Sequence, residues 1–255
     1  MKTSAMQRLR RWTLGGGSIV MFLALWELGV HVFKVRPITL PPPSAVLLDL
    51  AHDWSWYLDH IYYTLLTTLA GFALSVVVGV GVAMLLVGSR TFEESIYPVI
   101  VGLNSVPKVA VAPLFVIWMG TGSAPKIAMA FMIGVFAVLV DAVHGLRSVP
   151  QDVMDLGRVL KGSPLDFFLK VRLPCALPSI LTGMKVAIAL SLVGAIVGEF
   201  VASQRGLGYV ILTAQGTFDT TRVFAAVLLL AVMGLVLYGA VAWAERKATP
   251  WRVTH

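Results

Sequence analysis

Charged residues are scarce in this 255-residue chain: Asp, Glu, Lys and Arg make up 13% of it, whereas hydrophobic residues make up 58%. Soluble domains carry about 25% charged residues, and the mean hydropathy of this chain is +0.85. Too few polar residues remain to cover a soluble globule of this size. The shortage of charge therefore excludes a soluble protein and indicates an all-α integral membrane protein.

Cysteine and catalytic motifs are also lacking. Cys175 is the one cysteine, which excludes an intrachain disulfide framework and a cysteine-rich metal site. The motifs H-E-x-x-H and G-x-S-x-G do not occur, the histidines do not cluster, and GTGSAPK at 120–126 lacks the G-x-x-x-x-G-K-[ST] spacing that cradles phosphates. We therefore expect no enzymatic activity, no metal and no ATP bound by this chain itself.

Long apolar runs are what the sequence has instead. About 20 apolar residues suffice to span a bilayer as a helix, and six such runs occur, at 16–34, 60–88, 96–118, 125–146, 175–202 and 222–244. Residues 1–15 form a basic stub, and we expect the run after it to be an uncleaved first helix. The polar stretches between the runs are too short to fold alone, so residues 1–255 are predicted to form a single transmembrane domain.

Lys and Arg indicate the orientation of the chain. If there are six spans, 13 of the 20 lie in the stub, the 89–95 loop, the 146–174 segment and the tail, whereas five lie on the other side. Positive charge is retained on the cytoplasmic side, which predicts both termini in the cytoplasm of a bacterial inner membrane. The opposite face carries the external loop 35–59, in which three prolines precede an amphipathic helix that Ser44 is predicted to cap.

Polar residues and prolines concentrate in the third and fifth runs. Buried charge is costly in a membrane and usually faces a cavity or a partner, and backbone groups freed by proline need protein or water around them. The candidate pathway residues are Asn104, Ser105, Lys108, Lys185 and Glu199. Alternatives stay open: Lys108 can reach the membrane interface by snorkelling, and Lys185 and Glu199 can serve as structural partners.

Small residues predict where helices pack closely. Gly71, Gly79 and Gly81 recur in the second run, and GMKVAIALSLVGAIVG fills much of the fifth. Small side chains let membrane helices approach each other. We therefore interpret both stretches as packing surfaces.

The segment 150–174 interrupts the apolar pattern. A helix is predicted after Pro150, Gly162-Ser163-Pro164 breaks it, and Pro164 begins a second short helix that Leu173-Pro174 is expected to end. The spacing of apolar residues leaves the charged ones on the opposite face. The sequence therefore predicts a helix–break–helix elbow at the inner face of the membrane.

This elbow resembles the cytoplasmic coupling loop of ABC importer permeases, in which Glu-Ala-Ala, three residues and Gly precede an apolar-x-Leu-Pro. Five stretches more narrowly resemble the nitrate/sulfonate/taurine-type subfamily: LPPPSAVL (40–47), TLLTTLAGFALSVVVGVGVAMLLVGS (64–89), VPKVAVAPLFVIWMGTG (106–122), LPCALPSILTGMKVAIALSLVGAIVGEF (173–200) and RGLGYVI (205–211). The resemblance implies the type I ABC importer permease fold, with six transmembrane helices and a coupling elbow between the fourth and fifth.

The resemblance also implies a coupling site. Asp155 stands at the family's Glu, Leu156 and Gly157 stand at the two Ala positions, and Lys161 stands at the Gly. Gly157 lowers helix propensity by about 1 kcal/mol relative to Ala, and the two departures imply an adapted ATPase groove. The implied ATPase-coupling residues are Asp155, Leu156, Gly157, Arg158, Lys161, Gly162, Ser163 and Pro164.

The implied partners are a second copy of the chain, two cytoplasmic ATPases that bind ATP and Mg, an external solute-binding protein and membrane lipid, with no nucleic acid. The implied function is import of a small anion such as a sulfonate, taurine or nitrate, which Lys108 and Lys185 also favour. The alternatives are a permease of another ABC importer subfamily (vitamin precursor, phosphonate or metal), an ion-coupled secondary carrier and a membrane enzyme. Without inverted repeats or a midplane carboxylate cluster, the carrier is disfavoured.

Overall fold

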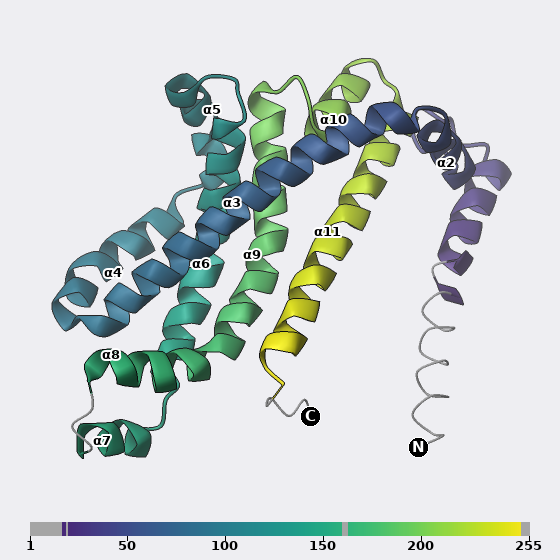
Figure 1. The fold of residues 1–255 in the computed structure, drawn as a ribbon. Coiled ribbons are helices and arrows are strands. Elements are labelled where there is room, and N and C mark those ends of the chain that lie inside the picture. The colour runs from purple at the N-terminus through teal and green to yellow at the C-terminus, as the bar shows by residue number, and fades with distance from the viewer. Residues whose placement is uncertain (1–16, 19, 160–162, 251–255) are drawn as a thin grey trace, which may run out of the picture. The chain divides into compact units, whose positions relative to one another are not determined.

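The computed structural model describes residues 17, 18, 20–159 and 163–250 (Figure 1). The stub 1–15 therefore lies outside the described residues, as do Lys161 and Gly162 of the coupling loop. In the described ranges every regular element is a helix. The chain divides into two compact units, Met1–Leu58 with Val210–Leu229 and Asp59–Tyr209 with Leu230–His255.

The first unit contains short helices and the ends of longer ones. Its elements are an apolar helix Val20–Val32, α2 (Pro43–His52), the start of α3 (Trp54–Gly88), most of α10 (Leu207–Gly216) and the start of α11 (Thr220–Ala248).

Two polar contacts of the first unit hold α2 in place. The backbone N–H and the hydroxyl of Ser44 donate to the carboxylate of Glu27 at 3.0 and 2.8 Å. The expected N-cap role of Ser44 is therefore wrong, because α2 begins at Pro43 with Pro42 at the N-cap position, and the Ser44 hydroxyl binds Glu27 instead. At the other end of α2, Arg222 of α11 forms ion pairs with Asp49 at 3.5 Å and with Asp53.

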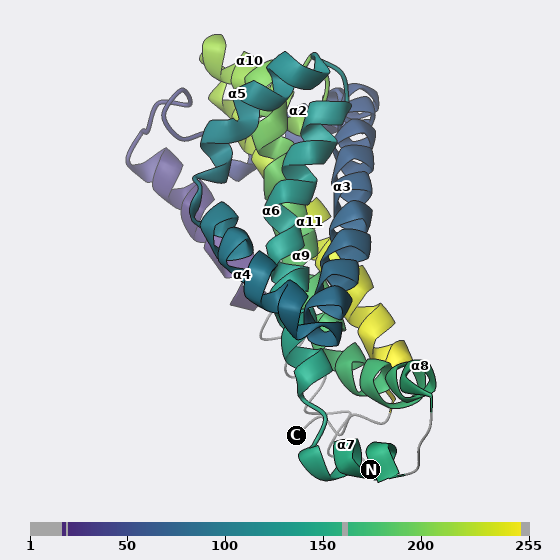
Figure 2. The same cartoon turned by 90° about the vertical axis from the view of Figure 1, so that its left-hand side faces the viewer.

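The second unit contains most of the long helices (Figures 1 and 2). Besides the rest of α3 and the second part of α11, it comprises α4 (Arg90–Ser105), α5 (Lys108–Met119), α6 (Ala124–Arg147), α7 (Gln151–Val159), α8 (Pro164–Phe167), the π-helical turn η1 (Phe168–Arg172) and α9 (Leu173–Ala202).

Four of the predicted spans are confirmed as long apolar helices. They are Trp54–Gly88, Ala124–Arg147, Phe168–Ala202 and Thr220–Ala248, at the predicted runs 60–88, 125–146, 175–202 and 222–244. At 35 residues, α3 is about 52 Å long, which exceeds the hydrocarbon core of about 30 Å. Of the run 16–34, the apolar helix Val20–Val32 is described, and the count of six spans stays a prediction.

The third run, 96–118, is interrupted within the span, at one of the three prolines that the sequence places there. It forms α4 and α5, which are bent by 96° relative to each other. Pro107 has no N–H to continue the helix and disfavours helical dihedrals at the residue before it. Val106 is accordingly extended, with φ −67° and ψ 132°. Pro98 and Pro113, by contrast, lie inside α4 and α5.

The expected helix end at Leu173-Pro174 is also wrong. The chain runs from α8 through η1 into α9, and the N–H of Leu173 donates to the carbonyl of Phe168, five residues back. Pro174 cannot donate the usual α-helical bond, and the π turn re-spaces the backbone hydrogen bonds before it, so the helix continues.

Helices α6 and α9 lie side by side and antiparallel, and glycines form the seam between them (Figure 2). A Cβ atom at Gly194 would lie 2.6 Å from the carbonyl oxygen of Met129, and one at Gly145 would lie 2.9 Å from that of Ala176. The glycines of this α6–α9 seam are Gly134, Gly145, Gly183, Gly194 and Gly198. Only a residue without a side chain permits such close backbone approach.

Glycines of α3 form a second close contact with α6. A Cβ atom at Gly71 would lie 2.9 Å from the carbonyl oxygen of Ile127, and one at Gly79 would lie 3.0 Å from the Cβ of Val138. The predicted packing role is therefore confirmed for these two. Gly81 differs, because an added Cβ would meet no described atom within 4 Å.

Gly194→Ala is expected to loosen the α6–α9 seam, because the new methyl group would collide with the backbone of α6. Overpacking of this kind costs about 1–3 kcal/mol, or roughly 2–12 °C in Tm for a chain of this size. The measurement is thermal unfolding in detergent, with Gly81→Ala as the matched control in a helix. Equal Tm values for the two variants would contradict close backbone packing at the α6–α9 seam.

Candidate coupling surface and pathway residues

Helices α7 and α8 lie where α6 ends and α9 begins. Asp155, Leu156, Gly157 and Arg158 belong to α7, and Asp155 is exposed. Pro164 begins α8, and the exposed Ser163 precedes it. The predicted coupling residues therefore lie on or beside the two expected helices, except for Lys161 and Gly162, which lie outside the described residues.

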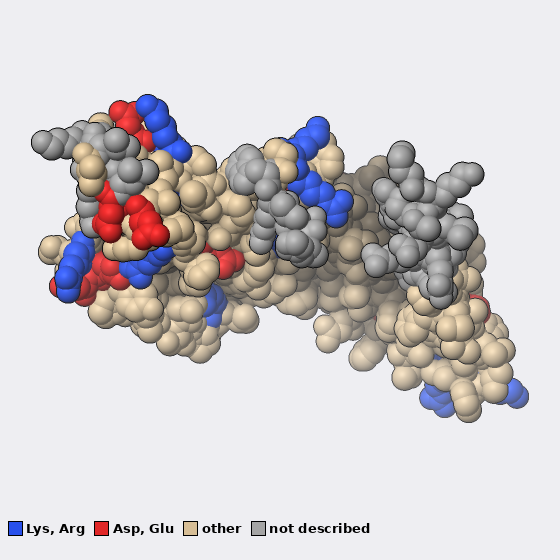
Figure 3. Space-filling model, turned by 90° about the horizontal axis from the view of Figure 1, so that it is seen from below, with Lys and Arg blue, Asp and Glu red and all other residues tan. Residues whose placement is uncertain are grey.

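Two contacts join parts of this segment, residues 150–174, to one another. The guanidinium of Arg172 in η1 donates to the sulfur of Met154 in α7 at 3.5 Å. Lys170 forms an ion pair with Asp166 at 2.9 Å. Figure 3 shows side chains of both charges gathered over α7 and α8. An exposed surface with both charge signs suits contact with another protein better than burial in lipid.

An ion pair links the end of α6 to α4. Arg147, the last residue of α6, lies 2.5 Å from the carboxylate of Glu93. Because α7 follows Arg147 after three residues, this pair ties the base of the candidate coupling surface to the first arm of the bent α4–α5 pair.

Three of the five candidate pathway residues come together at the α4–α5 bend. Asn104 and Ser105 end α4, and Lys108 begins α5. The Lys108 ammonium donates to the backbone and side-chain oxygens of Asn104 at 3.1 and 2.9 Å, and lies 4.8 Å from the ring centre of Phe136. Asn104 and Ser105 are exposed. The bend thus collects polar groups at a surface, and their pathway role stays a prediction.

Lys185 lies elsewhere, paired with a residue of α11. Its ammonium is 2.6 Å from the carboxylate of Glu245, and the two side chains are only 18% and 13% exposed. Structural pairing, the alternative that the sequence left open for Lys185, is what the structure shows. Sequence reasoning missed Glu245, because nothing local to it indicates a partner about 60 residues away.

Glu199 is buried and holds a loop to α3. Its carboxylate accepts hydrogen bonds from the hydroxyl of Thr64 at 2.8 Å and from the N–H of Gly208 at 2.7 Å. The N–H of Leu207 donates to the Thr64 oxygen at 2.8 Å, and that of Gly206 donates to His60 Nδ1 at 3.0 Å. Three consecutive backbone donors are thus satisfied by three side chains, in an arrangement that we call the clasp.

The glycines of the clasp are required by its geometry. Gly206 has φ +104°, a value that side-chain-bearing residues rarely adopt. A Cβ atom at Gly208 would lie 2.9 Å from the Cβ of Glu199. Residues 205–208, RGLG, belong to one of the stretches that resemble the permease subfamily, but the sequence does not indicate their partners His60 and Thr64.

Lys126 is a second buried residue that sequence reasoning missed. It is one of the five basic residues on the predicted outer side, and its side chain is fully buried. Its ammonium donates to the carbonyl oxygens of Thr121 at 2.5 Å, Gly122 at 2.7 Å and Ala202. The Lys126 charge therefore joins the start of α6 to the end of α9.

Residues 56–250 match a family model described as "Binding-protein-dependent transport system inner membrane component". This chain belongs to that family. Like the family, it is a multi-pass membrane protein, with several apolar helices long enough to span a bilayer.

Several relatives match this chain over nearly its whole length. A "Probable ABC transporter permease protein" of Haemophilus influenzae is 35% identical, over 88% of this chain and 91% of its own length. A formylaminopyrimidine transport permease protein of Halalkalibacterium halodurans is 30% identical, over 91% and 93%. Other relatives are named as transport permeases for riboflavin, aliphatic sulfonates, taurine, bicarbonate and nitrate. The family and its sulfonate/taurine/nitrate type are thus as the sequence predicted.

The fold is similar to that of a chain of the MetNI methionine ABC transporter, solved in inward-facing conformations. The TM-score is 0.67, with 18% identity, over 76% of this chain and 96% of that one. This similarity confirms the type I ABC importer permease fold.

Gly206→Ala is expected to open the clasp of this permease, because the Cβ would be strained at φ +104° and would collide with Glu199. Strain of this kind costs about 1–3 kcal/mol. The Tm in detergent should fall. The rate of trypsin cleavage after Arg205 should rise. Gly216→Ala, at a glycine with no atom within 4 Å of an added Cβ, is the control. Unchanged cleavage would argue against the clasp.

Proposed function

We propose that this permease works as a pair of identical subunits that form the pathway of an ABC importer in a bacterial inner membrane. The proposal rests on one observation: residues 150–174 connect the end of α6 to the start of α9. Because glycines hold α6 and α9 in backbone contact, a force applied to α7 and α8 would move both helices as one body. Such coupling requires only that the permease has two conformations whose free energies differ by a few kcal/mol.

Both termini and the α7–α8 segment lie in the cytoplasm in this proposal. Two ATP-binding-cassette ATPases bind ATP and Mg, and the coupling residues Asp155, Leu156, Gly157, Arg158, Lys161, Gly162, Ser163 and Pro164 contact them. The permease itself catalyses no reaction. An external solute-binding protein delivers the substrate, a partner that the family's description as binding-protein-dependent supports.

We infer a small anion as the substrate class, such as a sulfonate, taurine or nitrate. The names of several relatives support it. A vitamin-precursor heterocycle is the second candidate, favoured by the relatives named for formylaminopyrimidine and riboflavin.

Affinity purification of the chain from its native membrane in mild detergent tests the proposed assembly. We expect a P-loop ATPase to co-purify in equal amount and to show vanadate-sensitive ATP hydrolysis. A chain that comes out alone, under conditions that keep a known importer intact, would contradict the proposal and favour a secondary carrier.

Asp155→Arg combined with Gly162→Leu is expected to abolish transport without affecting membrane insertion. The first change reverses the charge of an exposed α7 residue, and the second places a bulky side chain in the turn that the sequence predicts. Uptake of radiolabelled substrate into cells and the amount of chain in the membrane are measured together.

The matched control is Glu94→Arg combined with Gly88→Leu. It makes the same chemical changes at exposed positions outside residues 150–174, and an added Cβ at Gly88 meets no atom within 4 Å. Uptake at the original rate in the Asp155/Gly162 variant would refute the coupling assignment.

A further inference from the structure

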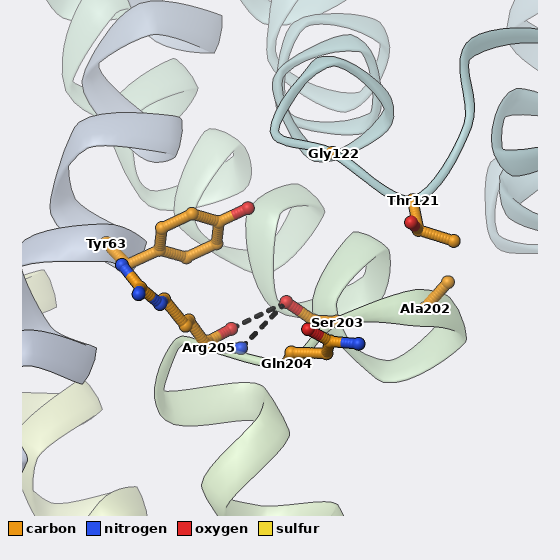
Figure 4. Close-up of a pocket in the computed structure, with 7 residues that line it drawn as sticks. All are labelled: Tyr63, Thr121, Gly122, Ala202, Ser203, Gln204 and Arg205. Atoms are coloured by element: carbon orange, nitrogen blue, oxygen red, sulfur yellow. Dashed lines mark hydrogen bonds between the residues drawn. The ribbon is translucent and has the colours of Figure 1, made fainter.

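A hollow of about 420 Å³ opens beside the clasp (Figure 4). Its lining comes from three separate parts of the chain: Tyr63 of α3, the Thr121–Gly122 turn, and residues 202–205, which run from the end of α9 into the loop before the clasp. Pockets for small molecules have volumes of about 300–1,000 Å³. The hollow is therefore large enough for a small solute.

The walls of the hollow are fixed by hydrogen bonds behind them. The buried Lys126 ammonium binds a carbonyl oxygen of Thr121, Gly122 and Ala202, which are three of the lining residues. The hydroxyl of Ser203 donates to the backbone oxygen of Arg205 at 2.6 Å. A site with fixed walls loses little entropy when it binds a ligand.

The charges around the hollow favour an anion. The three carbonyl oxygens that would repel an anion each accept a hydrogen bond from the Lys126 ammonium. Arg205 adds a positive charge to the lining, and among the described residues its guanidinium forms no direct ion pair with an acid. Asp59, one turn before Tyr63 on α3, does not line the hollow.

Polar groups in the hollow complement this charge. In Figure 4 the Arg205 side chain runs toward Tyr63, and the Tyr63 hydroxyl points into the space between the loop and the Thr121–Gly122 turn. The amide of Gln204 and the hydroxyl of Thr121 belong to the same lining. Guanidinium, hydroxyl and amide donors are the groups that bind carboxylate, sulfonate and similar oxyanions.

We infer that this hollow is an entry site for a small oxyanion, whose acid group binds Arg205 and whose remainder lies against Tyr63. The inference rests on the proposed function, in which this end of α9 faces outward and receives solute from the binding protein. It adds a substrate-contacting site to the permease itself, in addition to the site in the binding protein.

Protection of an introduced thiol tests the site in the intact complex in nanodiscs. Cys175→Ser removes the native thiol, which is exposed, and Gln204→Cys adds one to the lining. The neutral reagent N-ethylmaleimide is then applied with methanesulfonate, or with neutral methanesulfonamide. A site with a Kd of about 1 mM is nine-tenths occupied at about 10 mM, so methanesulfonate should slow labelling roughly tenfold.

The controls separate charge from simple obstruction. Arg205→Gln in the same background should abolish the protection, whereas Arg36→Gln, at another exposed cation that does not line the hollow, should keep it. Arg205→Gln is expected to leave the fold intact, because Ser203 binds only backbone atoms of Arg205, and an unchanged Tm would check this.

Every other outcome overturns the inference. Equal slowing by both compounds would indicate a hollow without charge selectivity, and protection by 4-aminopyrimidine alone would assign the site to a heterocycle. No slowing at all, in a complex that still contains the ATPase, would remove the entry site and leave the proposed function standing. Loss of the ATPase would instead refute the proposed function, while the labelling rates could still be interpreted.

Discussion

The close approach of α6 and α9 is the contact on which both the proposed coupling segment and the proposed entry site depend. In a membrane, helices associate through van der Waals packing of small residues, because lipid is as apolar as their side chains. Glycines from Gly145 at one end to Gly198 at the other let the two backbones meet over the length of α6. Residues 150–174 leave from one end of the seam, and Lys126 closes the other end by binding the last turn of α9.

Buried polar side chains lie next to backbone N–H and C=O groups that have no partner within a helix. Lys126 satisfies three carbonyl oxygens, and the clasp satisfies three consecutive N–H groups with His60, Thr64 and Glu199. Unpaired backbone groups are costly in an apolar medium, so these side chains allow non-helical loops to exist beside membrane helices. The same bonds also fix the walls of the hollow, which makes the loops suitable as a binding surface.

The α4–α5 pair has a different character from the seam. Pro107 bends it by 96°, and α4 contains no fully buried residue. Its link to α6 through Glu93 and Arg147 lies next to residues 150–174, the proposed contact for the ATPases. The structure thus combines a closely packed helix pair with a bent, more exposed one, and the Glu93–Arg147 ion pair joins the two.

The sequence by itself determined the membrane class, four of the spans and the family, since apolar length, charge distribution and local motifs are properties of contiguous residues. It also indicated the glycines at 71 and 79 as packing positions, because spacing along one helix defines a face. Only the tertiary structure decided what the isolated charges do: Lys185 pairs with Glu245, and Glu199 binds Thr64. The physical reason is that a buried charge takes its partner from another helix, and the distance between the two in sequence is set by the fold.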